Sequence, residues 1–109
     1  MITIHLTYTG QNGAARSFAR EMVASGTAAA IRAEEGNLRY EYYFPMEDSE
    51  SVLLVDQWRD QAALDVHHAS PMMGQIASLR EKYDLHMKAE HFVSDDSGLP
   101  EKDMKFIKK

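Results

Sequence analysis

Hydrophobic residues repeat with two different periods along this chain, and the order of those periods constrains the fold most. Four segments show the alternation or the β-branched and aromatic content of strands: residues 2–9, 38–44, 51–58 and 85–93. Apolar residues spaced three and four apart predict helical segments elsewhere: residues 15–30, 60–69 and 71–83. The resulting order, β-α-β-β-α-β, predicts an α+β protein of the ferredoxin-like type, with an antiparallel sheet and its helices on one face.

Three local signals refine these helices. Gly26 interrupts the first helical segment, which predicts a kink or an early end there. Asp60 is a suitable N-cap for the second. Ser70 and Pro71 form a favoured N-cap and first-turn pair, so we expect Ser70 to cap a further helical piece.

Composition and charge restrict the class of protein. We expect residues 1–93 of the 109 to form one domain, and residues 94–109 to be a polar loop and a basic tail that is disordered or adds a short strand. The net charge of −5 argues against nucleic acid or an anionic membrane as partner. The chain has no cysteine, which excludes thiolate nucleophiles and cysteine-bound metals. Apolar runs are too short for a membrane span, and residue 1 leads straight into a strand, so we expect a cytoplasmic protein.

Side chains that could take part in acid–base chemistry or ligand binding gather where the third strand passes into the second helix, within residues 52–71. Trp58 ends that strand, and His67 lies near the end of a helix that faces the sheet. Because the unperturbed pKa of histidine is about 6.5, His67 is a candidate general base. The plainer interpretation is a capping or core histidine without chemistry. His68, about 100° further round the helix, is expected to face solvent.

Other side chains are candidates for substrate contact, each with a structural alternative. Trp58 is either a core residue or a cavity wall, and Tyr40 either a sheet former or a hydroxyl that orients a phenol. His5 shares a strand face with two threonines, so it faces either a polar interior or a partner strand. The adjacent His67 and His68 point apart, and no second ligand pair stands at helical spacing, so we predict no metal site.

Three segments in this order resemble the antibiotic biosynthesis monooxygenase (ABM) family of the dimeric α+β barrel superfamily. They are EEGNLRY at residues 34–40, LVDQWRDQAALDVH at residues 54–67, and the pair Ser70-Pro71. The shared pattern is an acidic segment with glycine before a strand, then tryptophan, a short helix, histidine and proline. The resemblance extends over roughly residues 2–93. It implies a homodimer whose two sheets pack into a barrel, with a small cavity between sheet and helices in each subunit.

Members of this family differ in their reactions. Some oxygenate quinols or polyketide-type phenols without metal, flavin or haem, others degrade haem, and others isomerise a phosphorylated sugar. The resemblance places Asn37 near the cavity mouth. After the proline, where relatives commonly have histidine or an aromatic residue, this chain has Met72 and Met73, which implies a softer apolar wall. Residues 75–78 lack the axial histidine of the haem-degrading members, so we do not expect haem degradation.

The resemblance and the residues together lead to one main hypothesis and two alternatives. We expect a cofactor-independent monooxygenase that oxidises a quinol or polyketide-type phenol with O2, using His67 as base and Trp58 and Met72 as walls. The first alternative is an isomerase of a phosphorylated or hydroxylated carbonyl compound, with Arg39 or Lys88 receiving the anion. The second is a non-catalytic module that binds a small ligand. Oxygen consumption separates the first hypothesis from the isomerase.

Overall fold

The structure, a computed structural model that describes residues 1–108, contains a four-stranded sheet and five helices within that range. The strands are β1 (Ile2–Thr9), β2 (Asn37–Tyr43), β3 (Ser51–Trp58) and β4 (His86–Val93). The helices are α1 (Ala14–Ala24), α2 (Thr27–Arg32), α3 (Gln61–His68), α4 (Met72–Lys82) and α5 (Glu101–Met104).

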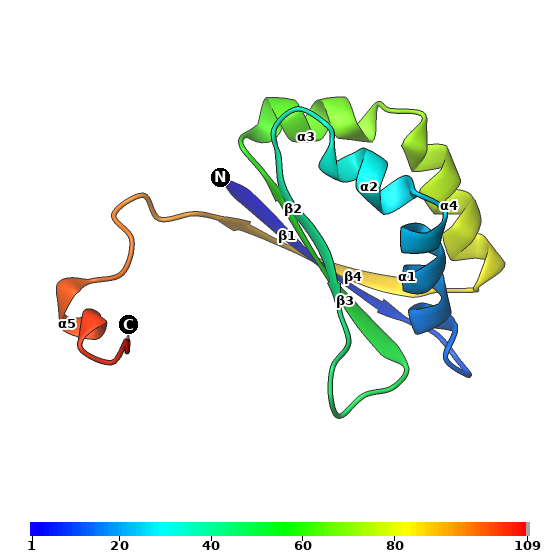
Figure 1. Ribbon diagram of the computed structural model, residues 1–109, viewed down its shortest axis with the longest axis horizontal. Coiled ribbons are helices and arrows are strands. Elements are labelled where there is room, and N and C mark those ends of the chain that lie inside the picture. Colours follow the sequence, from blue (N-terminus) through cyan, green and yellow to red (C-terminus); the bar gives the residue numbers. More distant parts are fainter. Residues whose placement is uncertain (109) are drawn as a thin grey trace.

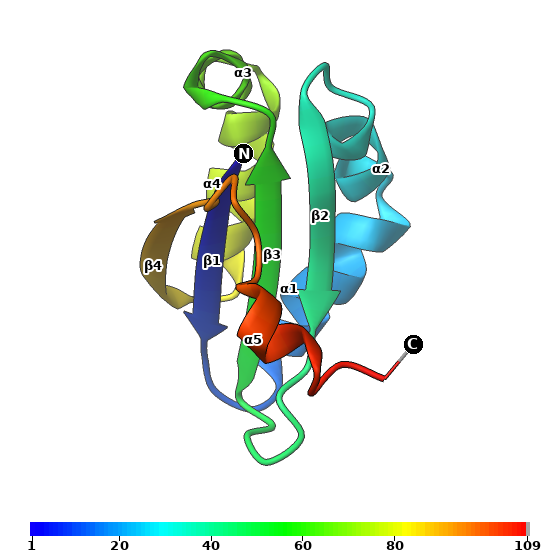
Figure 2. The same ribbon diagram turned by 90° about the vertical axis from the view of Figure 1, so that its left-hand side faces the viewer.

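The sheet has the predicted ferredoxin-like topology. Its strand order is β2-β3-β1-β4, and each neighbouring pair is antiparallel. Helices α1 to α4 lie together on one side of the sheet (Figure 1), and Figure 2 shows the other side, which those helices leave uncovered. The α+β class and the position of the helices on one face are therefore confirmed.

Alternation along each strand divides the sheet into two faces. The helix-covered face carries the following residues of β1, β3, β2 and β4: Ile2, Ile4, Leu6, Tyr8, Val52, Leu54, Asp56, Trp58, Tyr40, Tyr42, Met87 and Ala89. The open face carries Thr3, His5, Thr7, Leu53, Val55, Gln57, Arg39, Glu41, Tyr43, Lys88, Glu90 and Phe92. The hydrophobic core forms between the helix-covered face and the helices, where Trp58, Phe18 and Met22 are fully buried.

Local signals in the sequence account for the break between α1 and α2 and for the start of α3. Gly26 has a φ of 83° and separates α1 from α2, as predicted. Asp60 caps α3 through its side chain, which accepts a hydrogen bond of 2.9 Å from the Ala63 amide. The prediction for Ser70 was wrong: α4 begins at Met72, and the Ser70 hydroxyl is buried without a hydrogen-bond partner in residues 1–108. Its backbone carbonyl accepts from the Met73 amide instead.

The tail after β4 differs from both sequence expectations, because it forms the short helix α5 rather than a strand or a disordered segment. It extends away on the open-face side of the sheet (Figures 1 and 2). Four of its apolar side chains are exposed: Leu99, Met104, Phe106 and Ile107. Across residues 1–108, every helix is too short or too polar to cross a membrane. The cytoplasmic location stays a prediction.

Candidate functional site

A cavity of about 310 Å³ lies between the helix-covered face and helices α3 and α4. Its apolar wall comes from Ile4, Leu6, Leu54, Met73, Ile76, Met87 and Ala89. Its polar lining consists of Tyr8, Tyr40, Asp56, His67, His68 and Arg80. A mostly apolar cavity with a few convergent polar groups is the usual form of a small-molecule site.

His67 is held from two sides. Its ring stacks on Trp58 with centroids 4.7 Å apart, and only 3% of the residue is exposed. Nδ1 lies 3.0 Å from a carboxylate oxygen of Glu34, in the loop before β2. In the neutral ring, Nδ1–H donates to that carboxylate and Nε2 keeps its lone pair. Burial lowers the pKa of His67, against the opposing effect of Glu34. The imidazole is therefore neutral at pH 7 and able to accept a proton.

Asp56 places a carboxyl group on the same cavity wall. It lies in β3 two residues before Trp58, whose indole Nε1–H donates a 2.8 Å hydrogen bond to its Oδ1. Burial raises the pKa of Asp56 to about 7; the Trp58 bond lowers it and the negative charge of Glu34 raises it further. The carboxyl group is consequently poised between its acid and base forms near neutral pH.

Two tyrosines, Tyr8 and Tyr40, belong to the polar lining, and a third, Tyr42, contacts Tyr40 from outside it. The hydroxyls of Tyr40 and Tyr42 are 3.2 Å apart, and both pKa values are raised, chiefly by burial. Burial also raises the pKa of Tyr8 to about 12. All three phenols remain protonated at neutral pH, so they serve as hydrogen-bonding groups and not as bases.

The structure brings together some of the residues that the sequence singled out and separates others. His67, Tyr40 and Met73 line the cavity, and Trp58 lies behind His67 with none of its surface exposed. His68 is exposed, as expected, although it also lines the cavity.

The remaining candidates lie elsewhere. Met72 lines a neighbouring depression together with Glu34. The Asn37 amide donates to the backbone carbonyls of Arg39 and Gln57 at an irregularity in the β2–β3 pairing. His5 packs against Phe92 on the open face, because alternation turns it away from Ile4 and the cavity. Arg39 and Lys88, the anion receptors of the isomerase alternative, are on the open face too.

Four cavity or supporting residues were missed by sequence reasoning: Glu34, Asp56, Tyr8 and Arg80. Asp56 had a readable signal, since it stands two residues from both Leu54 and Trp58 and must share their buried face. A carboxyl group at such a position is rarely buried without a function or a partner. Glu34 had no such signal, because only the tertiary fold brings its loop to the end of α3.

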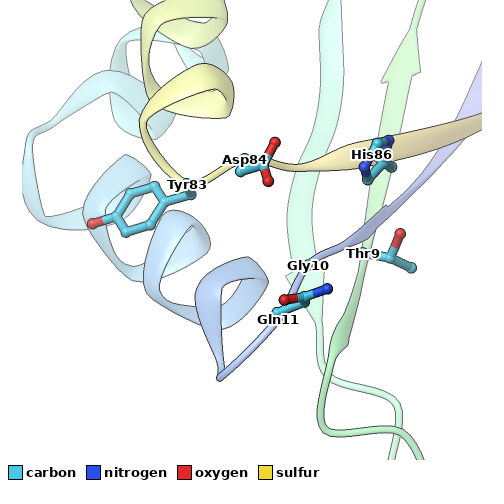
Figure 3. Close-up of a pocket in the computed structure, with 6 residues that line it drawn as sticks. All are labelled: Thr9, Gly10, Gln11, Tyr83, Asp84 and His86. Carbon is cyan, nitrogen blue, oxygen red and sulfur yellow. The ribbon is translucent and has the colours of Figure 1, made fainter.

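A second, polar pocket of about 350 Å³ lies at the other end of the molecule, where the loop after β1 meets the loop before β4. Figure 3 shows Gln11, Asp84 and His86 around it, while the Tyr83 ring points away toward the helices. The Tyr83 hydroxyl donates to Glu21 on α1. Within residues 1–108, no three histidine or carboxylate side chains come together as a metal site would require.

Comparisons with known proteins support the fold. A candidate antibiotic biosynthesis monooxygenase from Deinococcus radiodurans superposes with a TM-score of 0.77 at 21% identity, over 88% of this chain and 94% of that one. SnoaB, a cofactor-independent oxygenase from Streptomyces nogalater, superposes with a TM-score of 0.72 at 23% identity, over 92% of this chain and 97% of that one. A Pseudomonas aeruginosa protein superposes with a TM-score of 0.66 at 27% identity, over 85% of this chain and 94% of that one.

Sequence comparison settles the family. A search among curated proteins gave no match. The family profile described as "Antibiotic biosynthesis monooxygenase" matches residues 1–79, which include β1 to β3, α3 and His67. Because this match covers well over half of the 109 residues, the chain belongs to the antibiotic biosynthesis monooxygenase family.

Proposed function

We propose that this protein is a cofactor-independent monooxygenase that oxidises a small electron-rich aromatic compound, a quinol or polyketide-type phenol, with O2. The observation that carries the proposal is a buried neutral imidazole, His67, oriented by Glu34 and lining an apolar cavity. SnoaB, which shares the fold, is a cofactor-independent oxygenase. Such a substrate supplies its own electrons to oxygen, so the reaction needs no cofactor.

His67 begins the proposed reaction by taking the phenol proton, because a phenolate reduces O2 more readily than a neutral phenol. The phenolate passes one electron to O2, and the phenoxyl radical and superoxide combine through a new bond from a ring carbon to oxygen. Asp56 protonates the resulting peroxide. The Asp56 carboxylate then removes a proton from the same ring carbon, and the electron pair of that C–H bond forms the new C=O bond. The O–O bond breaks, the quinone forms, and the departing hydroxide takes the proton from His67 as water.

The proposed roles of His67 and Asp56 fit the surroundings of these two side chains. His67 is neutral before the reaction because burial lowers its pKa, and Asp56 is largely available as an acid up to about pH 7. Tyr40 and Met73 would hold the substrate, while Trp58 keeps both catalytic side chains in position through its ring face and its Nε1. We accordingly expect a bell-shaped pH dependence with its alkaline limb near pH 7.

Oxygen uptake with purified metal-free protein and a panel of reduced quinols and naphthols tests this function. We expect uptake above the autoxidation blank, lowered roughly 10²-fold or more in His67→Ala. His86→Ala is the control, since this histidine lies in the second pocket, at the other end of the molecule. No uptake across the panel, or conversion that continues equally without oxygen, would contradict the proposal and favour a binding module or an isomerase.

Glu34 provides a second test, as a positioning residue. Its charge raises the pKa of His67, so Glu34→Gln should move the acid limb of the pH–rate profile to lower pH and reduce turnover by roughly 10-fold. Glu35→Gln is the control: this neighbour is exposed, and its one ion-pair partner within residues 1–108 is Arg59, at 3.9 Å. An unmoved acid limb in Glu34→Gln would show that Glu34 does not act through His67.

We also propose that the protein forms a homodimer through the open face. Helices α1 to α4 leave this face uncovered, with α5 in front of part of it (Figure 2), and its apolar side chains Tyr43 and Phe92 are 39% and 45% exposed. Bare apolar residues on one face of a small sheet favour a second copy as cover. Light scattering after size exclusion should give twice the mass of the chain, and a monomer at micromolar concentration would refute this proposal.

A further inference from the structure

Arg80, near the end of α4, is the only arginine or lysine among the residues that line the cavity. Its side chain is half-buried. The Met87 sulfur, 2.8 Å from its Nη1, is its only hydrogen-bond acceptor within residues 1–108, and no carboxylate comes within 4.0 Å. A thioether is a weak acceptor, so within residues 1–108 most donors of this guanidinium have no protein partner and are open to water or a ligand.

Four of the five other arginines have oxygen partners within residues 1–108, and the fifth, the exposed Arg20, lies over the Phe44 ring. Arg32 donates to the Tyr40 carbonyl, Arg16 to the Pro45 carbonyl, and Arg59 approaches two carboxylates. A planar guanidinium without such a partner, beside an apolar cavity, is suited to bind a carboxylate through two parallel hydrogen bonds. The low polarity of the walls would strengthen that attraction.

The position of Arg80 relative to His67 restricts the ligand further. Arg80 contacts Met87, which pairs with Tyr8 in the sheet, whereas His67 stacks on Trp58 near the other end of β1. Ile4 pairs with Asp56, so the acid–base end and the arginine end are separated by the four residue steps from Ile4 to Tyr8. That spacing is roughly 13 Å along a strand.

We propose that the substrate is an aromatic acid: its phenol lies at His67 and Asp56, and a carboxylate at the far end of the ring system binds Arg80. This inference rests on the proposed function, because it names the class of substrate for the same cavity. A cavity of about 310 Å³ accommodates two fused rings with these substituents. A single ring that carries both groups side by side would not reach from one end to the other.

Calorimetric titration without oxygen tests the assignment independently of turnover. The probes are 6-hydroxy-2-naphthoate, whose hydroxyl and carboxylate are at opposite ends, its uncharged methyl ester, and 3-hydroxy-2-naphthoate, whose two groups are adjacent. We expect the first acid to bind the wild-type protein roughly 10- to 100-fold more tightly than its ester, from a charge-assisted bidentate pair. It should also bind more tightly than the adjacent isomer.

Variants assign the effect to Arg80. Arg80→Gln should remove the preference for the acid and leave ester affinity unchanged, and Arg80→Lys should restore part of the preference. Lys82→Gln is the matched control, since it removes one positive charge from the same helix at an exposed site paired with Glu21. Equal binding of acid and ester, no binding of the acid, or an equal loss in Lys82→Gln would overturn the inference. Arg80-dependent binding without oxygen uptake would instead refute the monooxygenase and leave the anion site standing.

Discussion

The two faces of the sheet are made from the same strands, yet they provide opposite environments. On the helix-covered face, Val52, Leu54 and Trp58 are at most 1% exposed. On the open face, Arg39 and Glu41 form a partly exposed ion pair, and Phe92 is 45% exposed. The helices account for this difference in exposure, because the alternation of side chains along each strand places apolar residues on both faces.

The comparison explains why the candidate acid and base, Asp56 and His67, lie on the helix-covered side only. Asp56 and Glu41 are both carboxylates in neighbouring strands, but only Asp56 is buried with an indole N–H as its hydrogen-bond partner. Removal from water shifts a pKa by stabilising the neutral form, which exposure prevents. A protein that needs an acid near pH 7 therefore has to place it under the helices.

The largest expected effect tests the two faces directly. Leu54 and Leu53 are adjacent in β3, on the helix-covered and open faces respectively. Leu54→Ala should lower the free energy of unfolding by roughly 2–5 kcal/mol, since it leaves a cavity in the core. Leu53→Ala should cost about 1 kcal/mol or less within a subunit and should weaken the dimer. Urea denaturation at several protein concentrations separates the two effects.

If Leu53→Ala destabilises the protein as much as Leu54→Ala at every concentration, the open face is packed within the subunit and the contrast is wrong. A loss that grows on dilution in Leu53→Ala alone would instead show that a second copy covers this face.

Sequence reasoning predicted the strands and their faces because alternation is a local property that burial enforces along each strand. It also predicted the Asp60 cap and the break at Gly26, which depend on residues close in sequence. The same alternation already implied that His5 faces away from Ile4. The contact between Glu34 and His67 was not predictable, because 33 residues separate them and only the fold joins them.

The second prediction concerns Asp56, whose pKa is about 7 against an ordinary value of 3.8. Between these values the folded protein binds more protons than the unfolded chain, so this carboxyl group lowers stability as pH rises from about 4 to 7. Asp56→Asn removes the titration and keeps an acceptor for Trp58. At pH 8 the variant should be more stable than wild type by on the order of 3 kcal/mol, and at pH 4 by little.

Thermal unfolding from pH 4 to pH 8 checks this. Glu41→Gln is the open-face control and should show no such pH-dependent gain. A difference between Asp56→Asn and wild type that stays constant with pH would mean that Asp56 does not titrate as a buried acid.

The third prediction concerns how tightly the helices approach the sheet. Gly36 has a φ of 85°, and a Cβ atom there would lie 2.5 Å from the Cβ of Ala63 on α3. Gly36→Ala should therefore cost roughly 2 kcal/mol of unfolding free energy, from backbone strain and the clash together. Gly13→Ala has the same strain at a φ of 78° without a neighbour within 4 Å, so it should cost about 1 kcal/mol. Equal losses in urea denaturation would show that α3 can move away from the sheet.

The smallest expected effect asks whether helix stability or side-chain contacts position His67. Asp60→Ala removes the N-cap of α3 and should cost about 1 kcal/mol, whereas Asp65→Ala, within the same helix, should cost less. Oxygen uptake by Asp60→Ala should nevertheless stay close to wild type, because Glu34 and Trp58 hold the imidazole at the other end of the helix. A loss of uptake larger than the loss of folded protein would mean that the helix start, and not these contacts, positions the base.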